Sequence, residues 1–202
     1  MSTEPSNEHP KMECACDAPK SESLGDKLAN WYYSVTDTTA EIKVESKSPE
    51  VKGPSYLKGE IKDYEMTQNG KYKVLVFYCK DYSIVCPKEL VAFNEKFKSF
   101  QDNNAELIGI SVDNVETHKK VSEATKENSG IGMLEYPLVA DTTHKICKSF
   151  GVMSMTGVAC RATIIVNPDN IVKYVQIHSL LFQRDTQAIL DELIKLQKGD
   201  SK

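Results

Sequence analysis

The fold is decided by the stretch Val74-Leu-Val-Phe-Tyr-Cys-Lys-Asp-Tyr-Ser-Ile-Val-Cys-Pro-Lys-Glu89. Its apolar first part, which ends at Tyr78, is typical of a strand in the centre of a sheet. A short loop follows, and Cys86 stands directly before Pro87, a residue favoured in the first turn of a helix. The stretch therefore predicts a strand, a loop and a helix that begins at or next to Cys86.

A cysteine at the start of a helix is a candidate nucleophile. Unpaired backbone N–H groups and the helix dipole favour an anion at that place, and the thiolate is the reactive form of cysteine. The alternative interpretation is a buried thiol that only fills space, which is the ordinary role of a free cysteine.

Strands and helices alternate along the rest of the chain. Short extended pieces between Thr36 and Tyr64, broken by proline and glycine, predict an N-terminal hairpin, and Leu24–Tyr33 predicts a short helix. Further strands are predicted at 73–78, 106–112, 161–166 and 171–177, and helices at 87–102, 115–127, 143–149 and 185–197. This order predicts an α/β fold with a mixed central sheet flanked by helices.

Length and composition limit the possible classes of protein. The 202 residues suffice for one domain and a tail, and we predict a flexible tail at 1–25, an extension at 26–45 and the domain at 46–202. The net charge of −4 gives no sign of nucleic-acid binding, and no run approaches the ~20 apolar residues of a membrane span. The polar N-terminus has no apolar core of a secretory signal, so we expect a cytoplasmic protein.

The active-site stretch resembles the signature of the typical peroxiredoxins, the alkyl hydroperoxide reductase C group. That signature reads Pro-x-x-x-Thr/Ser-x-x-Cys-Pro-x-Glu after a strand that ends in two aromatic residues. Here the matching residues are Ser83, Cys86, Pro87 and Glu89, preceded by Phe77-Tyr78. Further landmarks follow in family order at 108–113, Thr117-His118, 136–141, 150–152, Arg161 and Arg184. The resemblance covers roughly Pro49 to Leu196 and implies a thioredoxin-like fold.

The resemblance also implies roles for these residues. Cys86 is the nucleophile, held ionised, in reach of solvent and beside the permanent cation of Arg161. Ser83 hydrogen-bonds the peroxide and the sulfur, although local helix capping is an alternative. Glu89 pairs with Arg184 and orients Arg161, although a glutamate in the first helical turn is also favoured by the dipole alone. For Arg161 the alternative is an ordinary salt bridge at the surface.

The chain departs from the family pattern in its cysteines. Cys79 replaces the first proline of the signature, and no cysteine follows Cys160, so the usual C-terminal resolving cysteine is missing from this sequence. The thiol that regenerates Cys86 is predicted to be Cys14 or Cys16, an external thiol, or Cys79. For Cys79 we expect that the loop and a helical turn must rearrange first. We expect Cys147 in the core and Cys160 on the opposite side of its strand from Arg161.

Together these features predict a thiol-dependent peroxidase that reduces hydrogen peroxide and organic hydroperoxides through a cysteine sulfenic acid. No metal, haem or flavin cofactor is expected. The expected partners are a thioredoxin-like protein, another dithiol protein or glutathione, and a second copy of the chain in a homodimer or a larger ring; nucleic acid and membrane are not expected. Two alternatives stay open on the same scaffold, a peroxide sensor or thiol-oxidant relay and a holdase chaperone.

Overall fold

A computed structural model describes residues 42–125, 130–178 and 182–200 of the chain. The tail and the helix predicted at Leu24–Tyr33 lie outside these residues. The described elements are β1 (Lys52–Leu57), β2 (Glu60–Glu65), β3 (Tyr72–Phe77), α2 (Cys86–Glu95), α3 (Phe97–Asp102), β4 (Ala105–Ser111), α4 (Val115–Glu123), β5 (Leu138–Ala140), α5 (Lys145–Ser149), β6 (Ala162–Val166), β7 (Val172–Ile177) and α6 (Thr186–Asp200).

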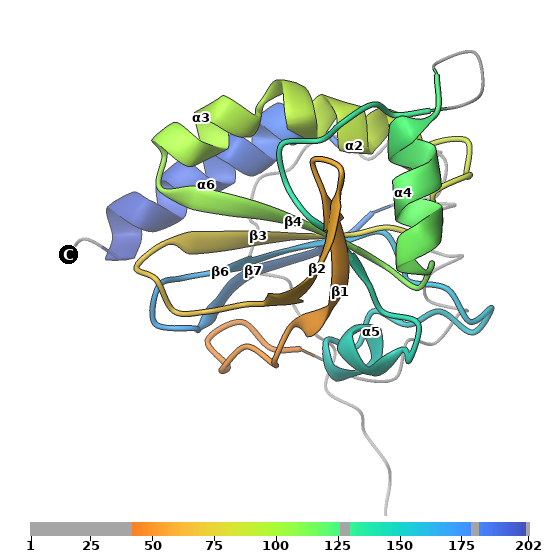
Figure 1. Cartoon of the computed structure of the whole chain (residues 1–202). Coiled ribbons are helices and arrows are strands. Elements are labelled where there is room, and N and C mark those ends of the chain that lie inside the picture. Colours follow the sequence, from red (N-terminus) through yellow and green to blue (C-terminus); the bar gives the residue numbers. More distant parts are fainter. Residues whose placement is uncertain (1–41, 126–129, 179–181, 201–202) are drawn as a thin grey trace, which may run out of the picture.

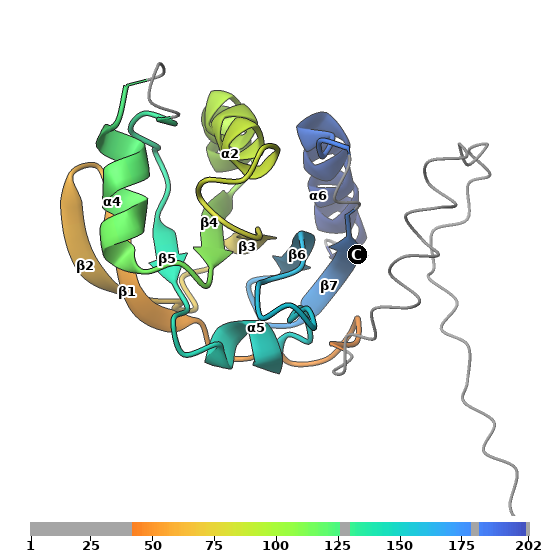
Figure 2. The same cartoon turned by 90° about the vertical axis from the view of Figure 1, so that its right-hand side faces the viewer.

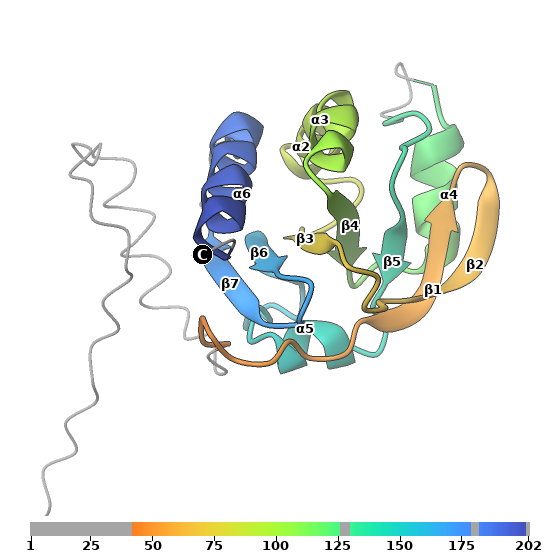
Figure 3. The same cartoon turned by 90° about the vertical axis from the view of Figure 1, so that its left-hand side faces the viewer.

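The described strands form one mixed sheet in the order β2-β1-β5-β4-β3-β6-β7. Strands β3, β4 and β5 run parallel to one another, and the outer strands pair antiparallel. Helices α2, α3, α4 and α6 cover one face, and α5 lies on the other (Figures 1 and 2). The hairpin β1–β2 closes one edge of the sheet, opposite to β7 (Figure 3). The predicted α/β class with a mixed sheet and flanking helices is confirmed.

The centre of the sheet is apolar on both faces. Every residue of β3 is buried. Val74 and Val76 pack toward α2 and α6, whereas Leu75 and Phe77 pack toward α5. A central strand covered on both sides has no solvent face, which explains why its sequence is a continuous apolar run and not an alternating one.

Most predicted elements are found, with three differences. The four predicted strands at 73–78, 106–112, 161–166 and 171–177 correspond to β3, β4, β6 and β7. The helix predicted at 87–102 breaks at Lys96, whose N–H bonds back three residues to the carbonyl of Phe93. The helix predicted at 115–127 ends at Glu123, because Ala124 is extended. Strand β5 was missed, since three residues are too short to show a periodic pattern.

Candidate active site

Cys86 is the first residue of α2 and follows the loop that leaves β3. The N-cap, Val85, has no side-chain capping bond, and the hydroxyl of Ser83 instead accepts a hydrogen bond from the Cys86 N–H at 3.2 Å. Pro87 lies in the first turn, where its missing N–H leaves no helical bond unmade. The prediction that the helix begins at or next to Cys86 is confirmed, and the thiol lies at the positive end of the helix dipole.

Two sulfurs meet at this helix start. The Sγ of Cys86 lies 2.9 Å from the Sγ of Cys79, which follows the end of β3. We expected that Cys79 can lie near Cys86, and that the loop and a helical turn must rearrange before a bond bridges them. The loop of 79–85 folds back and brings Cys79 over the first turn of α2, so the expected proximity is found.

The surroundings of the two sulfurs shift their pKa values in opposite directions. A hydrogen bond with Cys79 lowers the pKa of Cys86 to about 6, against the effect of burial, which raises it. The Ser83 hydroxyl and the backbone N–H groups of Cys79 and Lys80 lower the pKa of Cys86 further. The shared hydrogen bond and burial raise the pKa of Cys79 far above its ordinary value. The shared hydrogen bond therefore favours the thiolate on Cys86 and the proton on Cys79.

One turn further along α2, Glu89 lies between two arginines. Glu89, Arg161 and Arg184 are all buried. Arg161 donates to both carboxylate oxygens, through Nε at 3.2 Å and through Nη2, and Arg184 donates through its backbone N–H at 2.7 Å and through Nη2 at 3.1 Å. Burial alone raises the pKa of Glu89, but the charge of Arg184 and the hydrogen bonds of both arginines bring it below its ordinary value. Arg161 is therefore no surface residue, and Glu89 makes the two contacts that the resemblance implied.

Arg184 connects this cluster to the sheet. Its Nη1 donates to the carbonyl of Ala162 at 2.9 Å, and its Nη2 donates to the carbonyl of Phe77 at 2.9 Å. The guanidinium also lies 5.8 Å from the centre of the Phe93 ring. Because these carbonyls stand at the end of β3 and the beginning of β6, one side chain ties both strands to α2.

A buried network that the sequence did not indicate anchors the loop between the two cysteines. Asp81 accepts a hydrogen bond from the Tyr78 hydroxyl at 2.8 Å and lies 2.7 Å from Nδ1 of His118. The Asp81 N–H donates to Asp113 at 2.8 Å. His118 is fully buried. Asp81 in the loop pairs with His118 in α4, 37 residues later, and a contact over this distance leaves no periodic pattern in the sequence. Only the family landmarks at Asp113 and His118 therefore pointed to this region.

The two sulfurs differ in their exposure. Cys86 is 0% exposed, which corrects the expectation that its sulfur is in reach of solvent, whereas Cys79 is half-buried. A hollow of about 410 Å³ opens beside Cys79, Lys80, Tyr82, Ser83, Asp113, Thr156 and Val158. Cys79 and Ser83, both of which contact Cys86, therefore line this hollow, whereas Cys86 does not.

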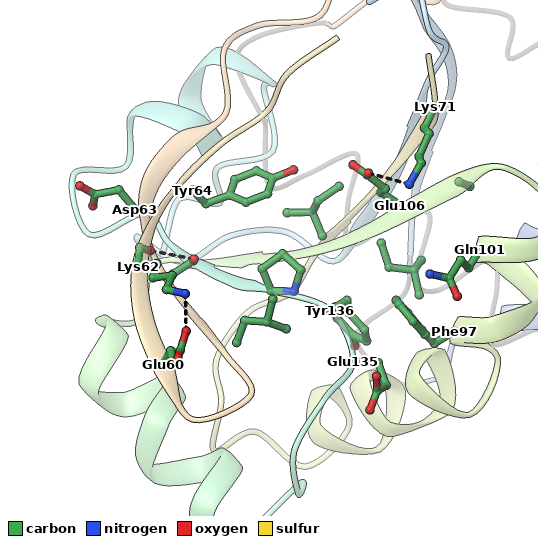
Figure 4. Close-up of a pocket in the computed structure, with 16 residues that line it drawn as sticks. Glu60, Lys62, Asp63, Tyr64, Lys71, Phe97, Gln101, Glu106, Glu135 and Tyr136 are labelled. Atoms are coloured by element: carbon green, nitrogen blue, oxygen red, sulfur yellow. Dashed lines mark hydrogen bonds and ion pairs between the residues drawn. The ribbon is translucent and has the colours of Figure 1, made fainter. Parts of the chain in front are cut away.

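A second hollow, of about 420 Å³, lies between the hairpin β1–β2, helix α3 and strand β4 (Figure 4). Tyr64, Phe97 and Tyr136 contribute apolar surface there, and Lys71 pairs with Glu106 at 3.4 Å. None of the described residues that line it is a cysteine or belongs to the predicted site. This hollow is separate from the sulfur chemistry.

The other described cysteines belong to the core. Cys147 and Cys160 pack on the α5 face of the sheet, and burial raises the pKa of both. The predictions of a core position for Cys147 and of an opposite orientation for Cys160 are confirmed. Cys14 and Cys16 lie outside the described residues.

Within the described ranges, no group of three or more His, Cys, Asp or Glu could hold a metal ion, and no helix is long and apolar enough to cross a bilayer.

Fold and site together point to a class of protein, the thiol-dependent oxidoreductases, with a low-pKa cysteine at the start of the helix that follows a central strand. Comparison with known proteins makes this specific. The family model described as AhpC/TSA matches residues 44–175, and the chain belongs to this family of peroxiredoxins, which are thiol-dependent peroxide reductases.

Two relatives illustrate the family membership. The chain is 34% identical over 166 residues to a mitochondrial thioredoxin-dependent peroxide reductase of Drosophila melanogaster, covering 81% of this chain and 69% of that protein. It is 36% identical over 142 residues to the putative peroxiredoxin YkuU of Bacillus subtilis (strain 168), covering 70% of this chain and 79% of that protein.

Solved structures confirm the thioredoxin-like fold. The reduced 2-Cys peroxiredoxin of Plasmodium vivax superposes with a TM-score of 0.76 at 27% identity, covering 80% of this chain and 100% of that chain. The AhpC of Enterococcus faecalis superposes with a TM-score of 0.73 at 29% identity, covering 78% of this chain and 94% of that chain.

Proposed function

We propose that this protein reduces hydrogen peroxide and small organic hydroperoxides with Cys86 as the attacking sulfur. The observation that carries the proposal is the lowered pKa of Cys86, about 6, at the first residue of a helix. An ordinary thiol has a pKa of about 8.5 and is only a few per cent ionised at neutral pH. A pKa near 6 makes the reactive form the dominant one.

In the proposed reaction the thiolate attacks one peroxide oxygen. The S–O bond forms while the O–O bond breaks, and the departing oxygen takes a proton and leaves as water or an alcohol. Cys86 is left as a sulfenic acid, Cys–SOH. Sulfur is thereby oxidised by two electrons and the peroxide is reduced by the same two.

We assign supporting roles to the polar groups around Cys86. The hydroxyl of Ser83, which already bonds the Cys86 N–H, is within reach to orient the peroxide. Arg161 and Arg184 supply fixed positive charge for the departing oxygen, and Glu89 holds both guanidiniums in place. Cations that are buried and already oriented stabilise developing negative charge without the cost of reorganisation.

We further propose that a protein dithiol of the thioredoxin type returns the electrons, and that the protein acts as a homodimer or a ring of dimers in the cytoplasm. The first part is supported by the relative from Drosophila melanogaster, whose name describes it as thioredoxin-dependent. Several relatives are named as mitochondrial or chloroplastic. Because no cysteine follows Cys160 in this sequence, we propose regeneration without a C-terminal resolving cysteine.

The test is peroxide turnover by the full chain with thioredoxin, dithiothreitol and glutathione compared side by side. We expect catalytic turnover with a dithiol and its loss in Cys86→Ser. A first turnover on Cys86 without any turnover by small or protein dithiols would favour the relay, which needs its client. Full activity of Cys86→Ser would overturn the proposal.

A further inference from the structure

The contact between two sulfurs on one side of the sheet has a chemical consequence. We propose that Cys79 is the resolving cysteine and closes a disulfide with Cys86 inside a single chain. This inference rests on the proposed function, because it requires that peroxide first oxidises Cys86.

Geometry favours Cys79 over the other thiols in the described part of the chain. A disulfide bond is about 2.05 Å long, so the sulfurs of Cys79 and Cys86 must move less than about 1 Å closer from their separation of 2.9 Å. The first turn of α2 can therefore keep its helical bonds during the reaction. Cys147 and Cys160 lie on the opposite face of the sheet and are excluded.

The loop that carries Cys79 is fixed. Tyr78 on one side of Cys79 and Asp81 on the other are joined by a buried hydrogen bond of 2.8 Å, and Asp81 is held in turn by His118 and Asp113. A resolving thiol held in contact by packing loses little freedom when the bond forms. The condensation therefore starts from a preorganised pair.

The step balances without any further reactant. The sulfur of Cys79 attacks the sulfur of the Cys86 sulfenic acid, the S–S bond forms and the S–O bond breaks. The departing hydroxide takes the proton of the Cys79 thiol and leaves as water. In the reduced pair, the hydrogen bond with Cys86 and burial raise the pKa of Cys79, so its thiol carries this proton before peroxide arrives.

The solvent exposure and the pKa values of the two cysteines then indicate which sulfur of the disulfide the reductant attacks. Cys79 is half-buried and lines the hollow of about 410 Å³, whereas Cys86 is 0% exposed. An incoming thiolate therefore forms its mixed disulfide with Cys79 and releases Cys86. The sulfur with the lower pKa is the better leaving group, and Cys86 is that sulfur.

The test maps disulfides in the full-length protein after one equivalent of hydrogen peroxide, with free thiols blocked before digestion. Trypsin cleaves after Lys80, which puts Cys79 and Cys86 on different peptides, so their bond appears as a linked pair. We expect this pair in the wild type, in Cys160→Ser and in the double variant Cys14→Ser/Cys16→Ser. The mapping needs no substitution at Cys79 and therefore does not depend on the folding of a variant.

Turnover gives the second readout. In Cys79→Ser without reductant we expect one equivalent of peroxide to convert Cys86 to the sulfenic acid, and a second equivalent to convert it to the sulfinic acid. We expect steady-state turnover with dithiothreitol to fall at least about tenfold. The matched control, Cys160→Ser, keeps its turnover within about twofold.

The outcomes separate this inference from the proposed function. A linked pair between Cys86 and Cys14 or Cys16, or only a mixed disulfide of Cys86 with an external thiol, overturns the role of Cys79 and leaves the peroxidase intact. Failure of the wild-type Cys86 to react with peroxide at all overturns the proposed function, and the resolving role with it.

Discussion

Two pairs of cysteines lie on opposite faces of the same sheet, and only one pair forms the site proposed for peroxide reduction. Cys86 and Cys147 are equally inaccessible, each 0% exposed, and each lies in the first turn of a helix. Yet the pKa of Cys86 is lowered and that of Cys147 is raised. Burial and a helix start are therefore not sufficient to produce a reactive thiolate.

The difference lies in the neighbouring polar groups. Cys86 receives hydrogen bonds from the Cys79 thiol, the Ser83 hydroxyl and backbone N–H groups. Burial raises the pKa of Cys147, and the nearby carboxylate of Asp141 raises it further, because its charge disfavours a second anion. Donors stabilise the thiolate on one face, and a carboxylate and apolar packing suppress it on the other.

The largest effect is expected from removing the reactive sulfur. Cys86→Ser should lower peroxide consumption at least about 10³-fold, because a serine hydroxyl is not ionised at neutral pH. The matched change on the other face, Cys147→Ala, should keep the rate within about twofold. Stopped-flow measurement of peroxide loss compares them, and equal losses of activity would show that the two faces do not differ in function.

The charge cluster should dominate stability. Glu89→Gln leaves two buried guanidiniums without their carboxylate, and we expect the free energy of unfolding to fall by about 3 kcal/mol. The control is Glu65→Gln, which breaks the exposed pair with Lys52 and should change the free energy of unfolding much less, because solvent screens that pair. Urea denaturation gives the free energy of unfolding of both variants. Similar unfolding midpoints for Glu89→Gln and Glu65→Gln would contradict the stabilising role assigned to Glu89.

The pH dependence should separate the two faces. Thiolate absorbance assigned to Cys86 should rise with pH through about 6, while Cys147 and Cys160 remain protonated at pH 8. Because folded Cys86 has already lost its proton where an unfolded thiol still holds it, this group makes unfolding free energy rise with pH between about 6 and about 8.5. The thiolate absorbance of wild type minus that of Cys86→Ser isolates the titration of Cys86. An inflection of this difference above pH 8 would refute the assignment of the low pKa to Cys86.

The smallest effect concerns the donor to the thiolate. Cys79→Ala removes the hydrogen bond to Cys86 and should raise the pKa of Cys86 by about one unit, whereas Cys79→Ser keeps an O–H donor and should raise it less. Cys160→Ala should leave the pKa of Cys86 unchanged. Titration of peroxide reactivity against pH measures all three, and an unchanged profile in Cys79→Ala would assign the low pKa to the helix start and Ser83 alone.

Part of this molecule could be predicted from the sequence because the evidence is local. The apolar run of β3, the loop and Pro87 together indicated the helix start at Cys86. The contacts of Glu89 with Arg161 and Arg184 span 72 and 95 residues, so only the family resemblance pointed to them.

Other features depend on how the chain turns back on itself. The contact of Cys79 with Cys86 follows from the path of a loop that Asp81 and His118 hold, and this pairing across 37 residues leaves no periodic signal. Strand β5 is similarly defined by its neighbours β1 and β4 and not by its own three residues.

The position of Arg184 also has a consequence for protein synthesis. This residue reaches the carbonyls of Phe77 and Ala162 and the carboxylate of Glu89, and it follows all of them in the chain. During translation the earlier segments leave the ribosome first. A nascent chain that ends before Arg184 lacks the hydrogen bonds that tie Glu89 on α2 to β3 and β6. The surroundings of the Cys86 sulfur are therefore complete only after Arg184, just before α6, has been made.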